Sequence, residues 1–255
     1  MSKVVNTCLK NFINKKNKKL KESKSLRGVS VITCTNNPNA LKNIIENYER
    51  QNFTEKELII IINNNHINIE DWKSKIGEIN NINIFKLDEK ISLGKCLNYG
   101  VSKSKYDYIA KFDDDDYYGP KYLSEAISGF KVSRASVVGK GTTIVYFVKS
   151  NTLALRDPGL EKRFVNFVNG STLVAKKSVF NKIKFRDMSA AEDVNFCRDC
   201  LQSGIRIYST SKYNHVYMRY PSKNKHTWKI SDDELLKRYC NVVGNTKDYI
   251  KYANN

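Results

Sequence analysis

The sequence predicts an α/β protein with a mixed, mostly parallel, Rossmann-like sheet flanked by helices. Three observations support this fold class. Short segments such as Leu58–Ile62 are apolar throughout, as in strands that are covered on both faces. These segments alternate with longer stretches of helical periodicity, as parallel strands and their crossover helices do. Polar clusters follow three of the strands, at the sheet edge where open α/β folds bind ligands.

The first half of the chain shows three strand–helix units followed by a fourth strand. Each strand is short and apolar, and each helical segment carries its apolar residues on one face. We expect strands at Val29–Cys34, Leu58–Ile62, Ile82–Leu87 and Tyr106–Phe112, and helices near Leu41–Gln51, Ile69–Ile76 and Leu93–Ser102.

The second half predicts a sheet that becomes mixed. Thr142–Val148 alternates clearly enough for an antiparallel strand, and Gly204 stands where a helix from Ala190 to Gln202 would end. We expect further helices at 120–130, 232–239 and 246–252, and further strands at 135–139, 174–180, 205–208 and 215–219.

The composition is that of one globular domain with a basic surface. The chain has 255 residues, 40% hydrophobic and 27% charged, with a formal net charge of +18. Its apolar runs are too short to cross a bilayer, its polar, lysine-rich beginning differs from a secretory signal, and its cysteines lack a disulfide-framework spacing. We therefore expect a domain over residues 28–255 in a reducing cytoplasm.

A basic extension over residues 1–27 carries nine Lys and Arg residues against Glu22, a local charge of +8. Residues 3–14 have the pattern of a short amphipathic helix, which would pack on the domain or lie on an anionic membrane; a solvated tail is the alternative. The positive charge favours anionic partners such as a membrane surface, a glycopolymer or a nucleotide-activated substrate. Nucleic-acid-binding signatures are absent from the sequence, so we expect no nucleic acid partner.

Four consecutive carboxylates, Asp113–Asp116, follow the fourth predicted strand. Side chains two residues apart in an extended segment point the same way, so Asp113 and Asp115 would face one ligand and their neighbours would face elsewhere. Two hard oxygen donors suit Mg²⁺ or Mn²⁺ bridging a diphosphate. The alternative is that these acids fill a turn and precede a helix, as single Asp residues commonly do.

Two other strand ends carry clustered amides and hydroxyls, at Thr33–Asn37 and Asn63–His66. Such groups could bind a base and a ribose beside the metal site, although Asn and Thr are also common turn residues. A glycine-rich dinucleotide fingerprint or P-loop does not follow the first strand, which argues against dehydrogenases and nucleoside triphosphatases.

Ser189–Asp193 opens the predicted helix with a Ser-x-x-Glu capping box, which gives Glu192 a structural role. Asp193 has no such role and could accept a proton from a hydroxyl group. Cys197 and Cys200 lie in the same helix without a second pair, so core packing is expected for them. His226, in a loop of polar and aromatic residues, is a candidate ligand.

These motifs, taken in order, resemble family 2 glycosyltransferases of the GT-A fold. The resemblance rests on Val29–Thr33, Glu57–Asn65, Leu93–Asn98 and Lys111–Asp116 for the nucleotide-sugar half, and on Asn169–Thr172 and Glu192-Asp193 for the acceptor side. It covers roughly residues 29–205. The stretch from Val29 and the His226-Thr227-Trp228 segment are similar to bacterial spore-coat and cell-surface members. The implied halves are residues 28–130 for the donor and 131–255 for the acceptor.

The resemblance implies inverting, metal-dependent transfer of a sugar, with UDP-sugar as the expected donor and a glycan hydroxyl at a cell or spore surface as the acceptor. A Gln-x-x-Arg-Trp motif and membrane helices are absent from the sequence, which favours the addition of single sugars. A peripheral position at a membrane or spore surface is also compatible with the basic extension. A sugar nucleotidyltransferase and a non-catalytic basic binding protein remain as alternatives.

The resemblance also assigns roles by position. Asn36 and Asn63 stand where many members carry an aromatic residue and an Asp, which leaves the identity of the base open. The nucleotide would contact Thr35, Asn36, Asn63, Lys95, Asn98, Asp113 and Asp114; the metal Asp115 and His226; the acceptor Gly170, Ser171, Thr172 and Glu192; and Asp193 would be the catalytic base.

Overall fold

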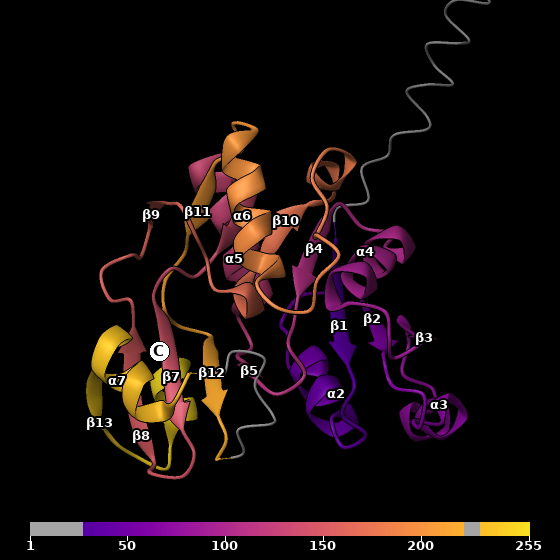
Figure 1. Ribbon diagram of the computed structural model, residues 1–255, viewed down its shortest axis with the longest axis horizontal. Coiled ribbons are helices and arrows are strands. Elements are labelled where there is room, and N and C mark those ends of the chain that lie inside the picture. The colour runs from indigo at the N-terminus through magenta and orange to yellow at the C-terminus, as the bar shows by residue number, and fades with distance from the viewer. Residues whose placement is uncertain (1–27, 222–229) are drawn as a thin grey trace, which may run out of the picture.

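A computed structural model describes residues 28–221 and 230–255 of the protein. Its larger sheet has eight strands in the order β3-β2-β1-β4-β10-β6-β11-β9 (Figure 1). The strands are β1 (Val29–Thr35), β2 (Lys56–Ile62), β3 (Ile82–Lys86), β4 (Tyr108–Lys111), β6 (Val137–Gly139), β9 (Arg163–Val165), β10 (Val174–Lys176) and β11 (Ile207–Ser209).

The first four strands are parallel, as predicted, and helices cover both faces of this part. β1 pairs with β2 on one side and with β4 on the other. On one face, Val31 and Ile60 pack against α2 (Leu41–Glu49), α3 (Ile69–Ile76) and α5 (Tyr122–Ser133). On the other face, Ile32 and Ile59 pack against α4 (Leu93–Lys103) and α6 (Glu192–Gln202). Burial on both faces explains the apolar strand sequences.

Cys197 and Cys200 of α6 are buried free thiols in the second of these cores, which confirms the packing role predicted for them. The larger sheet becomes mixed at β10, which is antiparallel to both β4 and β6. A strand at 174–180 was therefore predicted too long, because the chain leaves the sheet at Lys176 and forms the 3₁₀ helix η2 (Lys177–Asn181).

A second, five-stranded sheet has the order β13-β8-β7-β12-β5 and lies beside the larger sheet (Figure 1). The strand predicted at 142–148 belongs to this sheet as β7, where it is antiparallel to β8 but parallel to β12. Strands β5, β8 and β13 were not predicted. The strands are β5 (Tyr117–Tyr118), β7 (Thr143–Phe147), β8 (Thr152–Arg156), β12 (His215–Arg219) and β13 (Cys240–Asn245), with helices α7 (Asp232–Tyr239) and α8 (Tyr249–Ala253).

The order of the strands locates the ligand site. Because the chain runs outward from β1 to β2 and β3 and then returns to β4 on the other side, the strand order reverses between β1 and β4. A crevice forms at such a reversal, beyond the carboxyl ends of the two strands. Four aspartates, Asp113–Asp116, follow β4 after Phe112 and lead into β5, so this acidic loop also connects the two sheets.

Two of the sequence-based predictions lie outside the described residues, namely the amphipathic helix at 3–14 and the ligand role of His226. Over residues 28–221 and 230–255, no helix has both the length and the hydropathy needed to span a membrane.

Candidate active site

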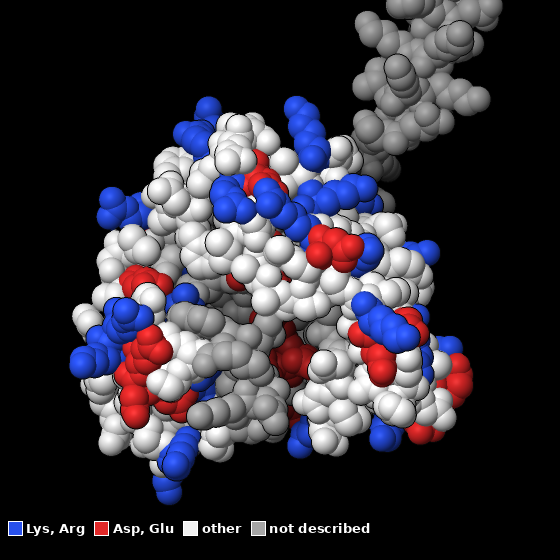
Figure 2. Space-filling view, viewed as in Figure 1, with Lys and Arg blue, Asp and Glu red and all other residues white. Residues whose placement is uncertain are grey.

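A cavity of about 1130 Å³ opens at the crevice between β1 and β4. In the surface view, acidic groups lie at the bottom of a hollow in the middle of the molecule, while most basic groups lie around the outside (Figure 2). Two walls enclose the cavity. One wall consists of the ends of β1 and β2 and the acidic loop, and the other consists of the 3₁₀ helix η1 (Gly170–Thr172), the start of α6 and side chains from β8 and β12.

The acidic loop supplies three carboxylates to the cavity, Asp113, Asp114 and Asp115. We predicted that Asp114 would face away, because strand alternation would turn it to the other side; that prediction is wrong. β4 ends at Lys111, so the loop leaves the extended conformation that the alternation requires. Asp114 accepts a short hydrogen bond from Thr35 Oγ1 at the end of β1.

Asparagine side chains of α2 fix the backbone of this loop. Asn43 Nδ2 donates to the carbonyl oxygens of Asp114 and Asp116, at 2.8 and 3.0 Å, and Asn47 Nδ2 donates to that of Asp116 at 2.8 Å. The acidic loop turns sharply and has no regular strand pairing, and these hydrogen bonds hold its backbone in place. Its carboxylates therefore have a defined direction. Burial, together with Asp116, Asp114 and Asp113, raises the pKa of Asp115 to about 9.

Asp116 turns away from the cavity and is fully buried beside His215 of β12. Its Oδ2 lies 3.1 Å from His215 Nε2, and its Oδ1 accepts a hydrogen bond of 3.0 Å from the Met218 amide. Burial and Asp113 raise the pKa of Asp116 to about 8, while burial and nearby Lys140 lower the pKa of His215 to about 3. The pair therefore has a structural role, because it joins the acidic loop to the second sheet.

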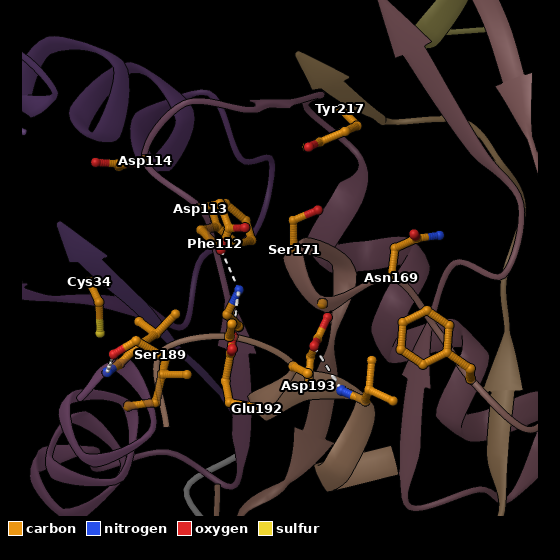
Figure 3. Close-up of a pocket in the computed structure, with 18 of the residues that line it drawn as sticks. Cys34, Phe112, Asp113, Asp114, Asn169, Ser171, Ser189, Glu192, Asp193 and Tyr217 are labelled. Carbon is orange, nitrogen blue, oxygen red and sulfur yellow. Dashed lines mark hydrogen bonds and ion pairs between the residues drawn. The ribbon is translucent and has the colours of Figure 1, made fainter. Parts of the chain in front are cut away.

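Lys111 connects the acidic loop with the opposite wall. Its Nζ lies 2.5 Å from Asp113 Oδ1 and 4.0 Å from Glu192 Oε1, and its side chain is buried (Figure 3). Burial alone would lower the pKa of Lys111, but Asp113, Glu192 and Asp193 outweigh it and raise the pKa. Lys111 therefore stays protonated and lies among carboxylates from both walls of the cavity.

The capping box predicted at Ser189 does not form. Helix α6 begins after Ala191, which has the left-handed φ of 60°, and Ser189 Oγ instead accepts a hydrogen bond of 3.2 Å from the Leu93 amide. Glu192 is buried toward Lys111, and its pKa is raised because burial and Asp193 outweigh the attraction of the lysine. The structural role of Glu192 is therefore an ion-pair contact, and the prediction of a cap was wrong.

Asp193 lines the cavity and is half-buried, and its Oδ1 accepts a hydrogen bond of 2.7 Å from the Val194 amide (Figure 3). Its carboxyl group packs on Gly170 of η1, where an added Cβ would stand 2.7 Å from Asp193 Cγ. Real Cβ atoms do not come this close to a carbon, so a glycine is needed at position 170 for the carboxylate to lie where it does.

The structure brings most of the predicted site residues into one cavity and leaves three outside its described lining. Lys95 is exposed and pairs with Asp187 at 2.6 Å, and both amide atoms of Asn98 bond the Phe185 backbone. Thr172, the last residue of η1, is fully buried, and its Oγ1 accepts a hydrogen bond from the Lys140 amide. The cavity is lined by Thr35, Asn36, Asn63, Asp113, Asp114, Asp115, Gly170, Ser171, Glu192 and Asp193.

Several cavity residues were not found from the sequence. Lys111 was included in the Lys111–Asp116 motif, but no role in the site was predicted for it. Arg198 lies five residues after Asp193 on α6, about 140° further round the helix, so helical spacing gave no reason to place it in the same site. Asn166, Arg156 and Tyr217 come from segments to which the sequence gave no site role, whereas Asn169 belongs to the predicted acceptor-side motif.

The carboxylates that line the cavity suit a hard divalent cation whose remaining oxygen ligands come from a bound molecule. Among the described residues, no group of three or more His, Cys, Asp or Glu side chains is arranged to hold a metal by itself. The carboxylates of the acidic loop nevertheless repel one another, since each raises the pKa of Asp115. A divalent cation would relieve this repulsion, and a diphosphate could complete its oxygen shell.

The fold and the cavity define this class of protein as a glycosyltransferase of the GT-A type. The model of the family described as glycosyl transferase family 2 matches residues 30–188, and the chain belongs to this family. Both the fold and the family predicted from the sequence are therefore confirmed.

One group of relatives and one group of solved structures are similar to this chain over part of their lengths. The poly-β-1,6-N-acetyl-D-glucosamine synthase of Staphylococcus aureus (strain MSSA476) is 27% identical over 183 residues, which cover 64% of this chain and 42% of the synthase. The structure of S. aureus TarS 1–349 in complex with UDP-GlcNAc has a TM-score of 0.62 at 16% identity, covering 82% of this chain and 64% of that one. S. aureus TarS has a TM-score of 0.61 at 17% identity, over 76% of this chain and 37% of that one. The chain thus spans about two fifths of the length of the synthases.

Proposed function

We propose that this protein is an inverting glycosyltransferase that moves one sugar from a UDP-sugar to a hydroxyl group of a cell-surface or spore glycan, with Mn²⁺ or Mg²⁺ as its cofactor. The observation that carries the proposal is that the acidic loop and Asp193 line one cavity from its two walls. The printed ligand of the similar TarS structure, UDP-GlcNAc, supports a UDP-sugar as donor, and the similar synthases support a surface polysaccharide as product.

The donor would lie against the wall formed by β1, β2 and the acidic loop. Thr35, Asn36 and Asn63 offer hydroxyl and amide groups to the nucleoside, and Asp115 would hold the cation together with the diphosphate. When bound, this cation neutralises the negative charge that the leaving nucleoside diphosphate gains. Asp113, which pairs with Lys111, would contact the ribose.

The acceptor would enter beside η1 and α6. Asp193 accepts the proton of the acceptor hydroxyl, whose oxygen then attacks the anomeric carbon from the face opposite the diphosphate. One displacement of this kind inverts the configuration at that carbon and requires no covalent intermediate. Gly170 and Ser171 border the same space and would contact the acceptor.

A thermal-shift panel tests this function. Ligands that bind the folded protein alone raise its melting temperature, so we expect a shift with UDP and with one UDP-sugar, larger with Mn²⁺ than with EDTA. Incubation with that donor should release UDP. Release of pyrophosphate would support a sugar nucleotidyltransferase, and the absence of any nucleotide effect would support a non-catalytic binding protein.

Association with an anionic surface through residues 1–27 is a separate part of this proposal. Their local charge of +8 would attract the protein to anionic lipid or glycopolymer in a salt-dependent way. Co-sedimentation with anionic vesicles should therefore weaken when residues 1–25 are deleted, and more so at low salt. Equal sedimentation of both forms would exclude this role.

A further inference from the structure

The hydroxyl group of Tyr118 joins the two walls of the cavity. It accepts a hydrogen bond of 2.7 Å from the Asp113 amide in the acidic loop and donates one of 2.7 Å to the Ser171 carbonyl oxygen in η1. The side chain is fully buried, and its ring stacks on Phe112 with centroids 3.7 Å apart. Burial, with Asp113 and Asp116, raises the pKa of Tyr118, so the hydroxyl keeps the proton that it donates.

A second bridge made of side chains runs beside the first. His215 Nε2 lies 3.1 Å from Asp116 Oδ2 and 3.2 Å from Ser171 Oγ, and all three side chains are buried. The acidic loop and η1 are therefore linked twice, once through backbone groups and once through side chains. Both links come from the strands β5 and β12, which pair at Tyr118 and His215.

The link continues to the proposed base, since the carboxyl group of Asp193 packs directly on Gly170 of η1. Contacts therefore connect the backbone of Asp113, through Tyr118 and η1, to Asp193. Tyr118 and His215 do not line the cavity themselves. Their effect is to fix how far the carboxylates of the acidic loop lie from the carboxylate of Asp193.

We propose that Tyr118 and His215 are positioning residues that hold the donor wall and the acceptor wall of the cavity at the separation required for transfer. The inference rests on the function proposed above, because that separation matters only if the donor's diphosphate and the base act on one sugar. Loss of either bridge leaves each wall folded but lets the two walls shift. Displacements of about 1 Å between reacting groups lower turnover by about 10²-fold, whereas binding to a single wall is little affected.

The chain provides a matched control in Tyr122. Its hydroxyl donates a hydrogen bond of 2.7 Å to the Thr172 carbonyl oxygen, so it also bonds η1, and its ring is buried beside Phe112 and Tyr118. Unlike Tyr118, Tyr122 receives no hydrogen bond from the acidic loop among the described contacts. Tyr118→Phe and Tyr122→Phe therefore each remove one buried hydroxyl bonded to η1, but Tyr118→Phe alone opens the bridge.

The experiment measures UDP release from UDP-GlcNAc with Mn²⁺, the dissociation constant of UDP, and amide hydrogen exchange, for the wild type and both variants. For Tyr118→Phe we expect kcat to fall about 10- to 100-fold, with KM and UDP affinity within about threefold. Exchange should become faster in the acidic loop and in η1 together. Tyr122→Phe should keep kcat within about threefold and speed exchange in η1 alone.

The bridge through His215 provides a second test, should Tyr118→Phe fail to fold. His215→Leu should lower kcat and speed exchange in both segments, and His215→Gln, which keeps a polar group near Nε2, should restore most of both. Equal effects of the two tyrosine variants on kcat, or faster exchange confined to one wall, would overturn the proposal. A wild type that releases no UDP from any UDP-sugar, with the variants still exchanging as expected, would refute the function proposed above and leave the coupling between the walls established.

Discussion

Lys111 and Asp113 form an ion pair at the bottom of the cavity, with Nζ 2.5 Å from Oδ1 and Glu192 on the far side of the same ammonium group at 4.0 Å. Lys111 is the last residue of β4, and Asp113 follows two residues later. The ion pair therefore lies at the end of the strand, where the acidic loop turns toward the cavity. The acids of this site are therefore arranged around an internal cation, and the divalent cation proposed for Asp115 would be a second one.

Replacing Lys111 tests this arrangement. Lys111→Met leaves Asp113, Glu192 and Asp193 close together without the cation, so we expect loss of stability. Removing one partner of a fully buried pair costs about 3–5 kcal/mol; we expect about 2–4 kcal/mol here, because the Asp113 side chain is 35% exposed. Urea unfolding at pH 7 measures this loss of stability. The control is Lys131→Met on the exposed side of α5, which should change stability by less than about 0.5 kcal/mol.

Asp115→Asn should abolish the metal dependence of nucleotide binding without unfolding the protein. The substitution removes one of several mutually repelling carboxylates, and Asp115 has a pKa raised by its neighbours, so the folded state should be as stable as the wild type or slightly more stable. Calorimetry with UDP and Mn²⁺ measures the binding, and thermal unfolding measures the stability. Asp71→Asn, at an exposed position of α3, serves as the control. Unchanged metal dependence would place the cation elsewhere.

The sequence predicted the parallel half of the fold accurately because each of its elements has a local cause. Strands such as β2 are wholly apolar since the sheet is covered on both faces, and α3 was predicted with its observed bounds. The second sheet was missed because β5 has only two residues, β8 and β13 are partly exposed, and the β5–β12 and β13–β8 pairings join strands that lie far apart in the chain.

The same distinction applies to the site. The acidic loop and the ends of β1 and β2 could be found from the sequence, since strand ends of parallel strands meet at one edge. Arg156 and Tyr217 could not, because β8 and β12 reach the cavity only through the second sheet. The spacing of Ser189 to Glu192 satisfies the capping pattern but gave a wrong prediction. Ala191 has a positive φ, so the helix starts later than the pattern implies, and Ser189 accepts a hydrogen bond from the Leu93 amide instead.

Glu125 and Lys140 form a buried pair whose contribution to stability should depend on pH. Burial raises the pKa of Glu125, but Lys140 and the Ser211 amide outweigh it, so the pKa in the folded protein is lowered. A group with a lowered folded pKa stabilises the protein above its unfolded pKa, and this contribution disappears as the pH falls through the folded pKa. Glu125→Gln should therefore destabilise the protein at pH 7 and make less difference below about pH 4. An equal difference at both pH values, measured by urea unfolding, would show that the charge of Glu125 is unimportant.

Gly170→Ala should impair turnover through Asp193. The new methyl group would collide with the Asp193 carboxyl group, so either the carboxylate or η1 has to move. We expect kcat to fall by about 10²-fold, the effect of about 1 Å of misplacement, while the affinity for UDP with Mn²⁺ stays near that of the wild type. Steady-state kinetics measure kcat, and calorimetry measures the affinity for UDP. A parallel loss of UDP affinity would mean that η1 belongs to the nucleotide site.

Asp193 and Glu192 compete for the role of catalytic base, and the structure separates them. Glu192 is buried, with its carboxylate 4.0 Å from Lys111 Nζ, whereas Asp193 is half-buried and its carboxyl group packs on Gly170 in the cavity wall. Adjacent helical residues point about 100° apart, so one acceptor hydroxyl can meet only one of them.

Asp193→Asn should therefore lower turnover by about 10²-fold or more while UDP affinity stays near that of the wild type, because the amide keeps the shape of the side chain but cannot accept the proton. Glu192→Gln is the matched control, since it also replaces a carboxylate by an amide in the same turn of α6. The pKa of Glu192 is raised in the folded protein, so its charged form is disfavoured there, and the neutral amide should leave the melting temperature near that of the wild type or slightly above it and retain most of the turnover. Turnover, UDP affinity and melting temperature are measured for both variants. A loss of turnover in Glu192→Gln with activity retained in Asp193→Asn would reverse the two roles.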